Sequence, residues 1–201
     1  MTGNAQQKTL TFADLAADLG KRPPRAGGTR VVAVDGPSGS GKTFFAARLA
    51  AALDAPTVGL DDLYPGWDGL AEAPGLLVRW LLAPLAQGRP ARYRRFDWER
   101  REYAEWRSVP AADTLVIEGV GSGARVCAPY LSFLVWIEAP EPLRMRRGIE
   151  RDGEVFRPYW ERWAVQERRM FAAERTRERA DLLVDGSAED ASGCGFVLLE
   201  G

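Results

Sequence analysis

Residues 30–43 read RVVAVDGPSGSGKT, an apolar run that leads into a glycine-rich loop. The run Arg30–Asp35 is rich in valine, which is typical of a strand buried on both faces of a sheet. The loop has the spacing Gly-x-x-x-x-Gly-Lys-Thr, and the residues from Thr43 to Leu53 contain many alanines and predict a helix. A strand, a loop and a helix in this order predict a loop that binds a phosphate group.

The residue types in the loop suit a nucleoside triphosphate. Glycines let the backbone curl so that successive amide groups point at one phosphate, and the following helix has a positively polarised N-terminus. Lys42 is expected to reach the β- and γ-phosphates, and the hydroxyl of Thr43 to ligate Mg²⁺. The alternative is an ordinary glycine and serine turn, but the full pattern is rare by chance. We therefore expect ATP and Mg²⁺ to be bound by Gly36, Ser38, Gly39, Ser40, Gly41, Lys42 and Thr43.

Length, charge and composition disfavour several other classes of protein. The chain has 201 residues and a formal net charge of −1, so no attraction to nucleic acid or to an anionic membrane is expected. Its uncharged apolar runs are shorter than the roughly 20 residues of a membrane span, and the N-terminus lacks the apolar region of a secretory signal. Cys127 and Cys194 lie far apart in a chain without histidine, which predicts two reduced thiols in a cytoplasmic protein.

Two further features narrow the class of nucleotide-binding protein. The sequence has no Asn-Lys-x-Asp segment of the kind that reads guanine, which disfavours a GTPase. At 201 residues the chain is also too short for the regulatory domains of most mechanical ATPases. Kinases of small molecules remain as the leading class. A protein that uses ATP as a switch or ligand, with little transferase activity, is the alternative from another class.

Strand and helix patterns alternate from residue 30 onward. Further strands are expected at residues 56–60, 114–117, 133–137 and 182–184. Helices are expected at residues 43–53, 74–86, 142–150 and 159–179. This alternation predicts an α/β fold of the P-loop NTPase type, three layers (α/β/α) with a five-stranded, mostly parallel sheet. We expect residues 1–29 to form a helix and a linker, and residues 30–201 to form the kinase domain.

Acidic residues follow three of the predicted strands, at the sheet edge where ligands bind in such folds. A kinase needs a carboxylate near the acceptor hydroxyl to take its proton as the oxygen attacks. Asp61 is the candidate base, and Asp62 is the second choice. Glu118 is expected to hold water that is bound to Mg²⁺. The alternatives are aspartates that cap a turn and a strand-end glutamate that faces solvent.

The ordered motifs resemble those of uridine kinases and of the wider group with phosphoribulokinase, pantothenate kinase and nicotinamide riboside kinase. The resemblance spans about residues 30–185. It rests on the phosphate loop, DDLY at 61–64, FDW at 96–98, IEG at 117–119 and an arginine-rich helix that ends in Arg151-Asp152. The loop is generic, whereas the order and spacing of the motifs make the combination stronger. The resemblance implies transfer of the γ-phosphoryl group of ATP to a hydroxyl of a nucleoside or nucleoside-like acceptor.

The resemblance also implies which residues hold the acceptor. Asp61 would lie beside the reacting hydroxyl, and Asp62, Tyr64 and Asp97 would help to bind the acceptor, with ribose hydroxyls as one candidate group. The chain departs from uridine kinases because it has no histidine, which those enzymes typically place against the base. A kinase of a sugar, a sugar phosphate or a vitamin or cofactor precursor is therefore the alternative.

Residues 87–110 are expected to form a segment on the substrate side. Their aromatic residues are Tyr93, Phe96, Trp98, Tyr103 and Trp106. These side chains form either a stacking surface for a base or ring, or the core of a small substrate-binding subdomain. The sequence leaves open whether one subunit or a homodimer forms the active unit.

Arg144, Arg147 and Arg151 are spaced so that they share one face of a helix. Guanidinium groups on a mobile segment suit the neutralisation of charge on a transferring phosphoryl group. We therefore expect an arginine-rich helical lid over about residues 141–160, with Arg144 on ATP and the other two in catalysis. The alternative is a solvated helix face whose arginines pair with acidic neighbours. Further on, arginines and glutamates alternate over residues 167–179 and predict a surface helix held by salt bridges, without a site.

Overall fold

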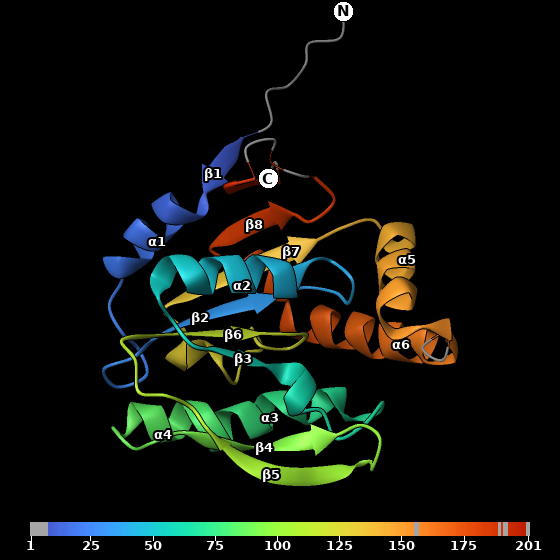
Figure 1. Ribbon diagram of the computed structural model, residues 1–201, viewed down its shortest axis with the longest axis horizontal. Coiled ribbons are helices and arrows are strands. Elements are labelled where there is room, and N and C mark those ends of the chain that lie inside the picture. Colours follow the sequence, from blue (N-terminus) through green and yellow to red (C-terminus); the bar gives the residue numbers. More distant parts are fainter. Residues whose placement is uncertain (1–7, 155–156, 189, 191–192, 200–201) are drawn as a thin grey trace, which may run out of the picture.

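The fold is built on a parallel sheet of five strands in the order β3-β6-β2-β7-β8 (Figure 1). The computed structural model describes residues 8–154, 157–188, 190 and 193–199. The strands are β2 (Arg30–Asp35), β3 (Thr57–Gly59), β6 (Thr114–Glu118), β7 (Phe133–Glu138) and β8 (Leu182–Asp185). The α/β class and the five-stranded sheet predicted from the sequence are confirmed.

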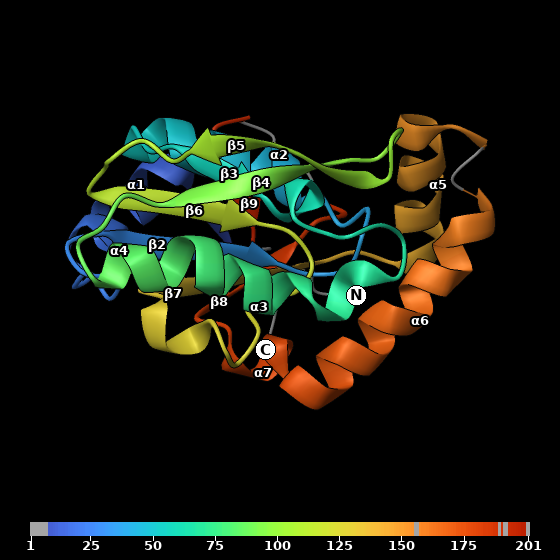
Figure 2. The same ribbon diagram turned by 90° about the horizontal axis from the view of Figure 1, so that it is seen from below.

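Helices cover both faces of this sheet (Figures 1 and 2). One face is covered by α1 (Phe12–Gly20) and α2 (Lys42–Leu53). The other is covered by α3 (Ala73–Leu77), a π-helical turn and α4 (Ala83–Ala86). The π-helical turn, Val78–Leu82, joins α3 to α4. The three layers are therefore those that the alternation of strands and helices predicts.

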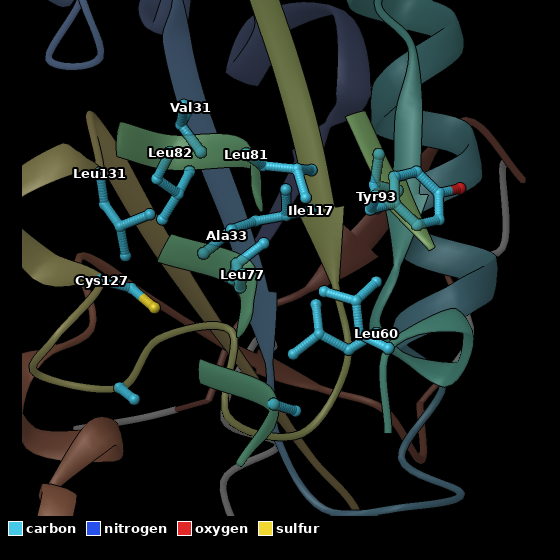
Figure 3. Packing of buried hydrophobic residues seen from close by; sticks show 14 of the residues in the cluster. Val31, Ala33, Leu60, Leu77, Leu81, Leu82, Tyr93, Ile117, Cys127 and Leu131 are labelled. Carbon is cyan, nitrogen blue, oxygen red and sulfur yellow. The ribbon is translucent and has the colours of Figure 1, made fainter. Parts of the chain in front are cut away.

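Strand β2 shows how the sequence specifies the two faces, because its successive side chains point in opposite directions. Val31 and Ala33 belong to the hydrophobic cluster under α3, whereas Val32 and Val34 belong to the cluster under α2. All four side chains are 0% exposed. Figure 3 shows the first cluster, in which Leu77 and its neighbours on the helical segment face β2 and β6. A strand so deeply buried holds the loop that follows it in a fixed place.

The remaining long helices lie beyond the carboxyl ends of the strands (Figures 1 and 2). They are α5 (Glu141–Asp152) and α6 (Arg157–Glu174), and the short α7 (Thr176–Arg179) follows. The single helix predicted for residues 159–179 is therefore wrong, since the chain turns at Arg175 with φ +51°. From β2 the chain crosses to one side of the sheet, where it forms β3 and β6, and then to the other side, where it forms β7 and β8. In such sheets ligands bind at the carboxyl end of the strand where this change of side occurs, which here is β2.

Two antiparallel strand pairs were not predicted from the sequence. A hairpin of β4 (Arg92–Asp97) and β5 (Glu102–Ser108) lies next to the α3 side of the sheet, and β1 (Thr9–Thr11) pairs with β9 (Gly195–Val197). Short 3-10 turns are present at Leu60–Asp62, Gly69–Ala71 and Ala128–Tyr130. The hairpin forms most of the predicted substrate-side segment.

Some predicted segments include residues that the structure does not describe. Residues 1–7 of the predicted N-terminal segment, 155–156 of the predicted lid, and 189, 191–192 and 200–201 lie outside the described residues. Cys127 is buried and Cys194 is exposed, and no disulfide joins them in the described part of the chain. Within the described residues, no helix has the length and apolar character that crossing a membrane requires.

Candidate nucleotide and acceptor site

The phosphate loop, residues 36–43, curls between β2 and the N-terminus of α2. Gly36, Gly39 and Gly41 have φ values of +142°, +76° and +101°, a region that favours glycine. A Cβ atom at Gly36 would lie 2.0 Å from the carbonyl oxygen of Ile137, and one at Gly39 would lie 2.3 Å from that of Arg144. Both the backbone conformation and the available space therefore require glycine at these two positions.

The side chains at the end of the loop fit a triphosphate with Mg²⁺. The ammonium group of Lys42 donates to the carbonyl oxygen of Pro37 at 3.0 Å, so it lies across the loop. The hydroxyl of Thr43 lies 3.4 Å from each carboxylate oxygen of Glu118, whose side chain is buried. A hydroxyl and a carboxylate are oxygen ligands of the kind that Mg²⁺ takes together with phosphate oxygens and water. The residues present therefore fit both groups.

Asp35 is a buried carboxylate at the start of the loop that the sequence analysis missed. Its Oδ1 accepts from the amides of Gly36 at 2.7 Å and Gly121 at 3.0 Å, and its Oδ2 accepts from the amide of Gly123 at 2.9 Å. Burial raises the pKa of Asp35 to about 6, although these amide hydrogen bonds lower it. Asp35 thus joins the phosphate loop to the turn after β6, the strand that ends in Glu118.

Asp61 is exposed and lies in the 3-10 turn after β3, at the same edge of the sheet as Glu118. Burial raises the pKa of Glu118, the charge of Asp61 raises it further, and the charges of Lys42 and Arg151 lower it. Asp61 and Arg151 are therefore each close enough to Glu118 to interact with it electrostatically. The carbonyl oxygen of Asp61 accepts from the indole nitrogen of Trp98 at 3.0 Å, which fixes the turn on the hairpin.

The neighbouring carboxylate of Asp62 has a different environment. Its Oδ2 accepts from the hydroxyl of Tyr93 at 3.0 Å and from the guanidinium of Arg107 at 3.0 Å. Both partners belong to the β4–β5 hairpin, so Asp62 holds the hairpin against the turn after β3. The predicted second choice for the base is thus engaged in a structural contact.

Two residues predicted to bind the acceptor also have structural partners. The ring of Tyr64 is 1% exposed, and its hydroxyl donates to the carbonyl oxygen of Val120 at 3.0 Å. Asp97 accepts from the amides of Glu99 at 3.1 Å and Arg100 at 3.0 Å, and thereby caps the turn of the hairpin. The structure corrects the prediction for Tyr64, because a ring buried to this extent presents no surface to an acceptor.

Two of the predicted lid arginines bind the backbone of the phosphate loop. Arg144 donates to the carbonyl oxygen of Ser38 at 3.1 Å. Arg147 donates to the carbonyl oxygens of Gly186 at 2.8 Å and Gly39 at 3.5 Å. The alternative of a solvated helix face is therefore excluded for both residues. These guanidinium groups fasten α5 to the loop and to the segment after β8.

Glu167 on α6 contradicts the prediction that residues 167–179 form a surface helix without a site. Its side chain is 3% exposed, and its Oε1 accepts from the amide of Ser38 at 2.8 Å. Its Oε2 lies 4.0 Å from the guanidinium of Arg144. Predicted surface ion pairs are present further along, as between Arg175 and Glu178 at 3.6 Å. Glu167 alone among the glutamates of this stretch reaches the loop in the described residues.

A cavity of about 540 Å³ opens beside the phosphate loop. Its lining includes Ser40, Gly41, Phe44, Arg48, Asp185 and Gly186. The ring of Phe44 is 67% exposed, and the guanidinium of Arg48 lies 5.2 Å from its centroid. An exposed ring next to the loop offers a flat apolar surface of the kind on which a nucleotide base stacks.

A second cavity, of about 530 Å³, lies between the hairpin and α6. Its lining includes Trp67, Phe96, Trp98, Tyr103, Tyr159 and Arg162. The rings of Trp67 and Tyr159 are stacked with centroids 4.7 Å apart and an interplanar angle of 11°. Three aromatic residues of the predicted segment thus line a cavity, while Tyr93 is buried in the core and Trp106 is half exposed. The set is therefore divided between the core and the lining of a cavity, and a stacking surface for a base or ring stays a prediction for the residues of the lining.

Two solved structures with a similar fold are described as kinases. One is a possible uridine kinase from Bacillus stearothermophilus, with 21% identity, a TM-score of 0.57, and coverage of 86% of this chain and 96% of that one. Another, provisionally described as a fructose transport system kinase from Silicibacter sp. TM1040, has 23% identity, a TM-score of 0.52, and coverage of 85% and 95%. No protein-family model matches the sequence, and no curated protein matches it. This similarity shows that the chain shares the α/β fold of these two structures.

Proposed function

We propose that this protein is a Mg²⁺-dependent kinase that transfers the γ-phosphoryl group of ATP to a hydroxyl of a nucleoside or nucleoside-like acceptor. The observation that supports this most is the position of Asp61. Its turn follows β3 at the edge where Glu118 and the phosphate loop lie, and Trp98, which lines the aromatic cavity, donates to its backbone. A carboxylate near Glu118, in a turn that is bonded to the aromatic cavity, supports a role for Asp61 as the base in phosphoryl transfer.

In this proposal the donor occupies the cavity beside the loop. The loop amides and Lys42 would bind the phosphates, Phe44 would stack on the base, and Thr43 and Glu118 would hold Mg²⁺. When bound, Mg²⁺ neutralises charge on the β- and γ-phosphate oxygens. Arg144 and Arg147 support the loop from outside, and they keep the lid helix against it.

The acceptor occupies the aromatic cavity with one hydroxyl turned toward Asp61. The hydroxyl oxygen attacks the γ-phosphorus in line with the bridging oxygen to the β-phosphate, and that bond breaks to release ADP. Asp61 takes the hydroxyl proton as the new bond forms. Aromatic side chains such as Trp98 and Tyr159 in the lining of this cavity favour an acceptor that carries a ring.

A second acceptor class is supported by two cations on the same cavity. Arg101 and Arg162 belong to its lining, and Arg162 pairs with Asp68. Guanidinium groups bind phosphate and carboxylate well. A sugar phosphate or a cofactor precursor with an anionic group is therefore the alternative acceptor.

A screen of ATP consumption over nucleosides, sugars, sugar phosphates and vitamins tests the proposal. We expect one acceptor to raise turnover above the basal ATPase rate. In Asp61→Asn, turnover should fall by about 10²-fold or more while the Kd for ATP changes by less than about twofold, because general base catalysis is lost. Asp62→Asn is the matched control, with a smaller loss of turnover. If no acceptor raises turnover, a nucleotide-binding switch replaces the kinase as the best interpretation.

A further inference from the structure

Glu167 places a carboxylate against a loop that is built to bind anions. The side chain is 3% exposed, and it comes from α6, about 130 residues after the loop in sequence. A buried carboxylate is costly unless hydrogen bonds and a cation compensate it. Since this charge also repels a phosphate nearby, its presence at the loop requires a specific role.

Glu167 and Arg144 together hold Ser38 of the loop, one by its amide group and the other by its carbonyl group. The amide of Ser38 donates to Glu167 at 2.8 Å, and the carbonyl oxygen of Ser38 accepts from Arg144 at 3.1 Å. Arg144 is itself held by the carbonyl oxygen of Ala139 at 2.9 Å and lies over the ring of Trp160. The two peptide groups that flank Ser38 therefore have their orientation set from outside the loop.

The helix that carries Glu167 is itself anchored. The side-chain amide of Gln166 donates to the carbonyl oxygen of Trp67 at 2.7 Å, and Trp163 packs edge-on against Tyr64 at a centroid distance of 4.9 Å. Trp67 lines the aromatic cavity. Glu167 is thus held on a fixed helix that contacts both the acceptor cavity and the phosphate loop.

We propose that Glu167 is a positioning residue that, with Arg144, holds Ser38 in the conformation in which the phosphate loop accepts a triphosphate. The inference rests on the proposed function, because it assigns Glu167 to the ATP site of that kinase. Arg144 partly neutralises the carboxylate, so the gain in preorganisation exceeds the repulsion of the phosphates. The opposite role would be inhibitory, because the negative charge of Glu167 would weaken the binding of ATP.

Calorimetry with ATP and Mg²⁺, together with steady-state kinetics, separates these two roles. We expect Glu167→Ala to raise the Kd and the KM for ATP about tenfold, with kcat changed by less than about twofold, because a charge-assisted hydrogen bond to the loop is lost. Glu167→Gln keeps an acceptor for the Ser38 amide but loses the attraction to Arg144, so we expect a rise of about threefold. Glu161→Ala, an exposed glutamate on the same helix, should leave both constants unchanged.

The direction of the change in the Kd for ATP decides between the positioning role and the inhibitory role. A folded Glu167→Ala that binds ATP as tightly as the wild type, or more tightly, overturns the positioning role. If circular dichroism shows that Glu167→Ala does not fold, Glu167→Gln decides, and an unchanged Kd overturns the role. If the wild type itself binds no ATP, the proposed function fails and this inference fails with it. If the wild type binds and the variants match it, only this inference fails.

Discussion

Two buried carboxylates, Asp35 and Glu167, accept hydrogen bonds from backbone amides of the phosphate loop. Asp35 is 0% exposed, and three backbone amides donate to it, from Gly36, Gly121 and Gly123. Burial raises its pKa from the ordinary 3.8 to about 6. A carboxyl whose pKa is higher in the folded state than in the unfolded state contributes stability below its unfolded pKa. That contribution is lost as the pH rises through the folded-state pKa, here between about pH 4 and pH 6.

Replacement of Asp35 by asparagine removes this titration. We expect the free energy of unfolding of the wild type, relative to Asp35→Asn, to fall by at most about 3 kcal/mol as the pH rises from about 4 to about 7. Urea unfolding at a series of pH values measures this difference. Asp54→Asn, at an exposed aspartate after α2, is the control for the substitution itself. A difference for Asp35→Asn that stays flat or grows with pH would contradict the assignment.

At this scale the sequence predicts a residue's role only where a pattern has one chemical meaning. Lys42 and Thr43 follow from loop spacing alone, and the structure brings Thr43 to Glu118. The role of Glu167 depends on which face of α6 is buried, and that face contains Trp160, Trp163 and Ala164 at helical spacing before it. A glutamate on a buried apolar stripe was thus a signal in the sequence. The sequence pattern could not predict that Glu167 contacts Ser38, because that contact depends on how α6 packs against the loop.

Elements differ in how far their sequences specify them. Buried strands such as β2 and β6 are continuous apolar runs, and they were predicted nearly to the residue. The hairpin strands β4 and β5 carry many charged residues and are largely half exposed or exposed, so neither an apolar run nor a clean alternation marks them. The three-residue strands β1 and β9 pair across almost the whole chain, and no local pattern predicts such a pairing.

Helix α5 offers a matched pair of arginines for a test of the lid. Arg147 bonds to Gly186 and Gly39 at the donor cavity, whereas Arg146 is exposed and pairs with Glu150 at 3.9 Å. We expect Arg147→Ala to lower kcat/KM for ATP about tenfold, since charge-assisted hydrogen bonds between α5 and the loop are lost. Arg146→Ala should change it by less than about twofold. Equal, small effects in steady-state kinetics would count against a role of α5 at the donor site.

In the whole molecule, the proposed donor site joins parts of the chain that are packed in separate hydrophobic clusters. Phe45 of α2 and Val184 of β8 belong to one cluster, whereas Trp163 of α6 belongs to the other. The loop and its contacts to α5 and α6 lie at the end of the sheet between these parts. A nucleotide that binds there contacts the folded state only, so it should stabilise the molecule as a whole.

This linkage gives a prediction for the complete fold through Lys42. At a concentration of ATP and Mg²⁺ about 100 times the Kd, the wild type should gain about 2.7 kcal/mol. For a chain of this length, that gain corresponds to a rise in Tm of roughly 5–10 °C. Lys42→Ala should unfold near the wild-type Tm without nucleotide but lose most of this rise, because the ammonium group that binds the phosphates is gone. Calorimetric scans of both proteins with and without ATP measure this, and an equal rise in the two would remove Lys42 from the phosphate site.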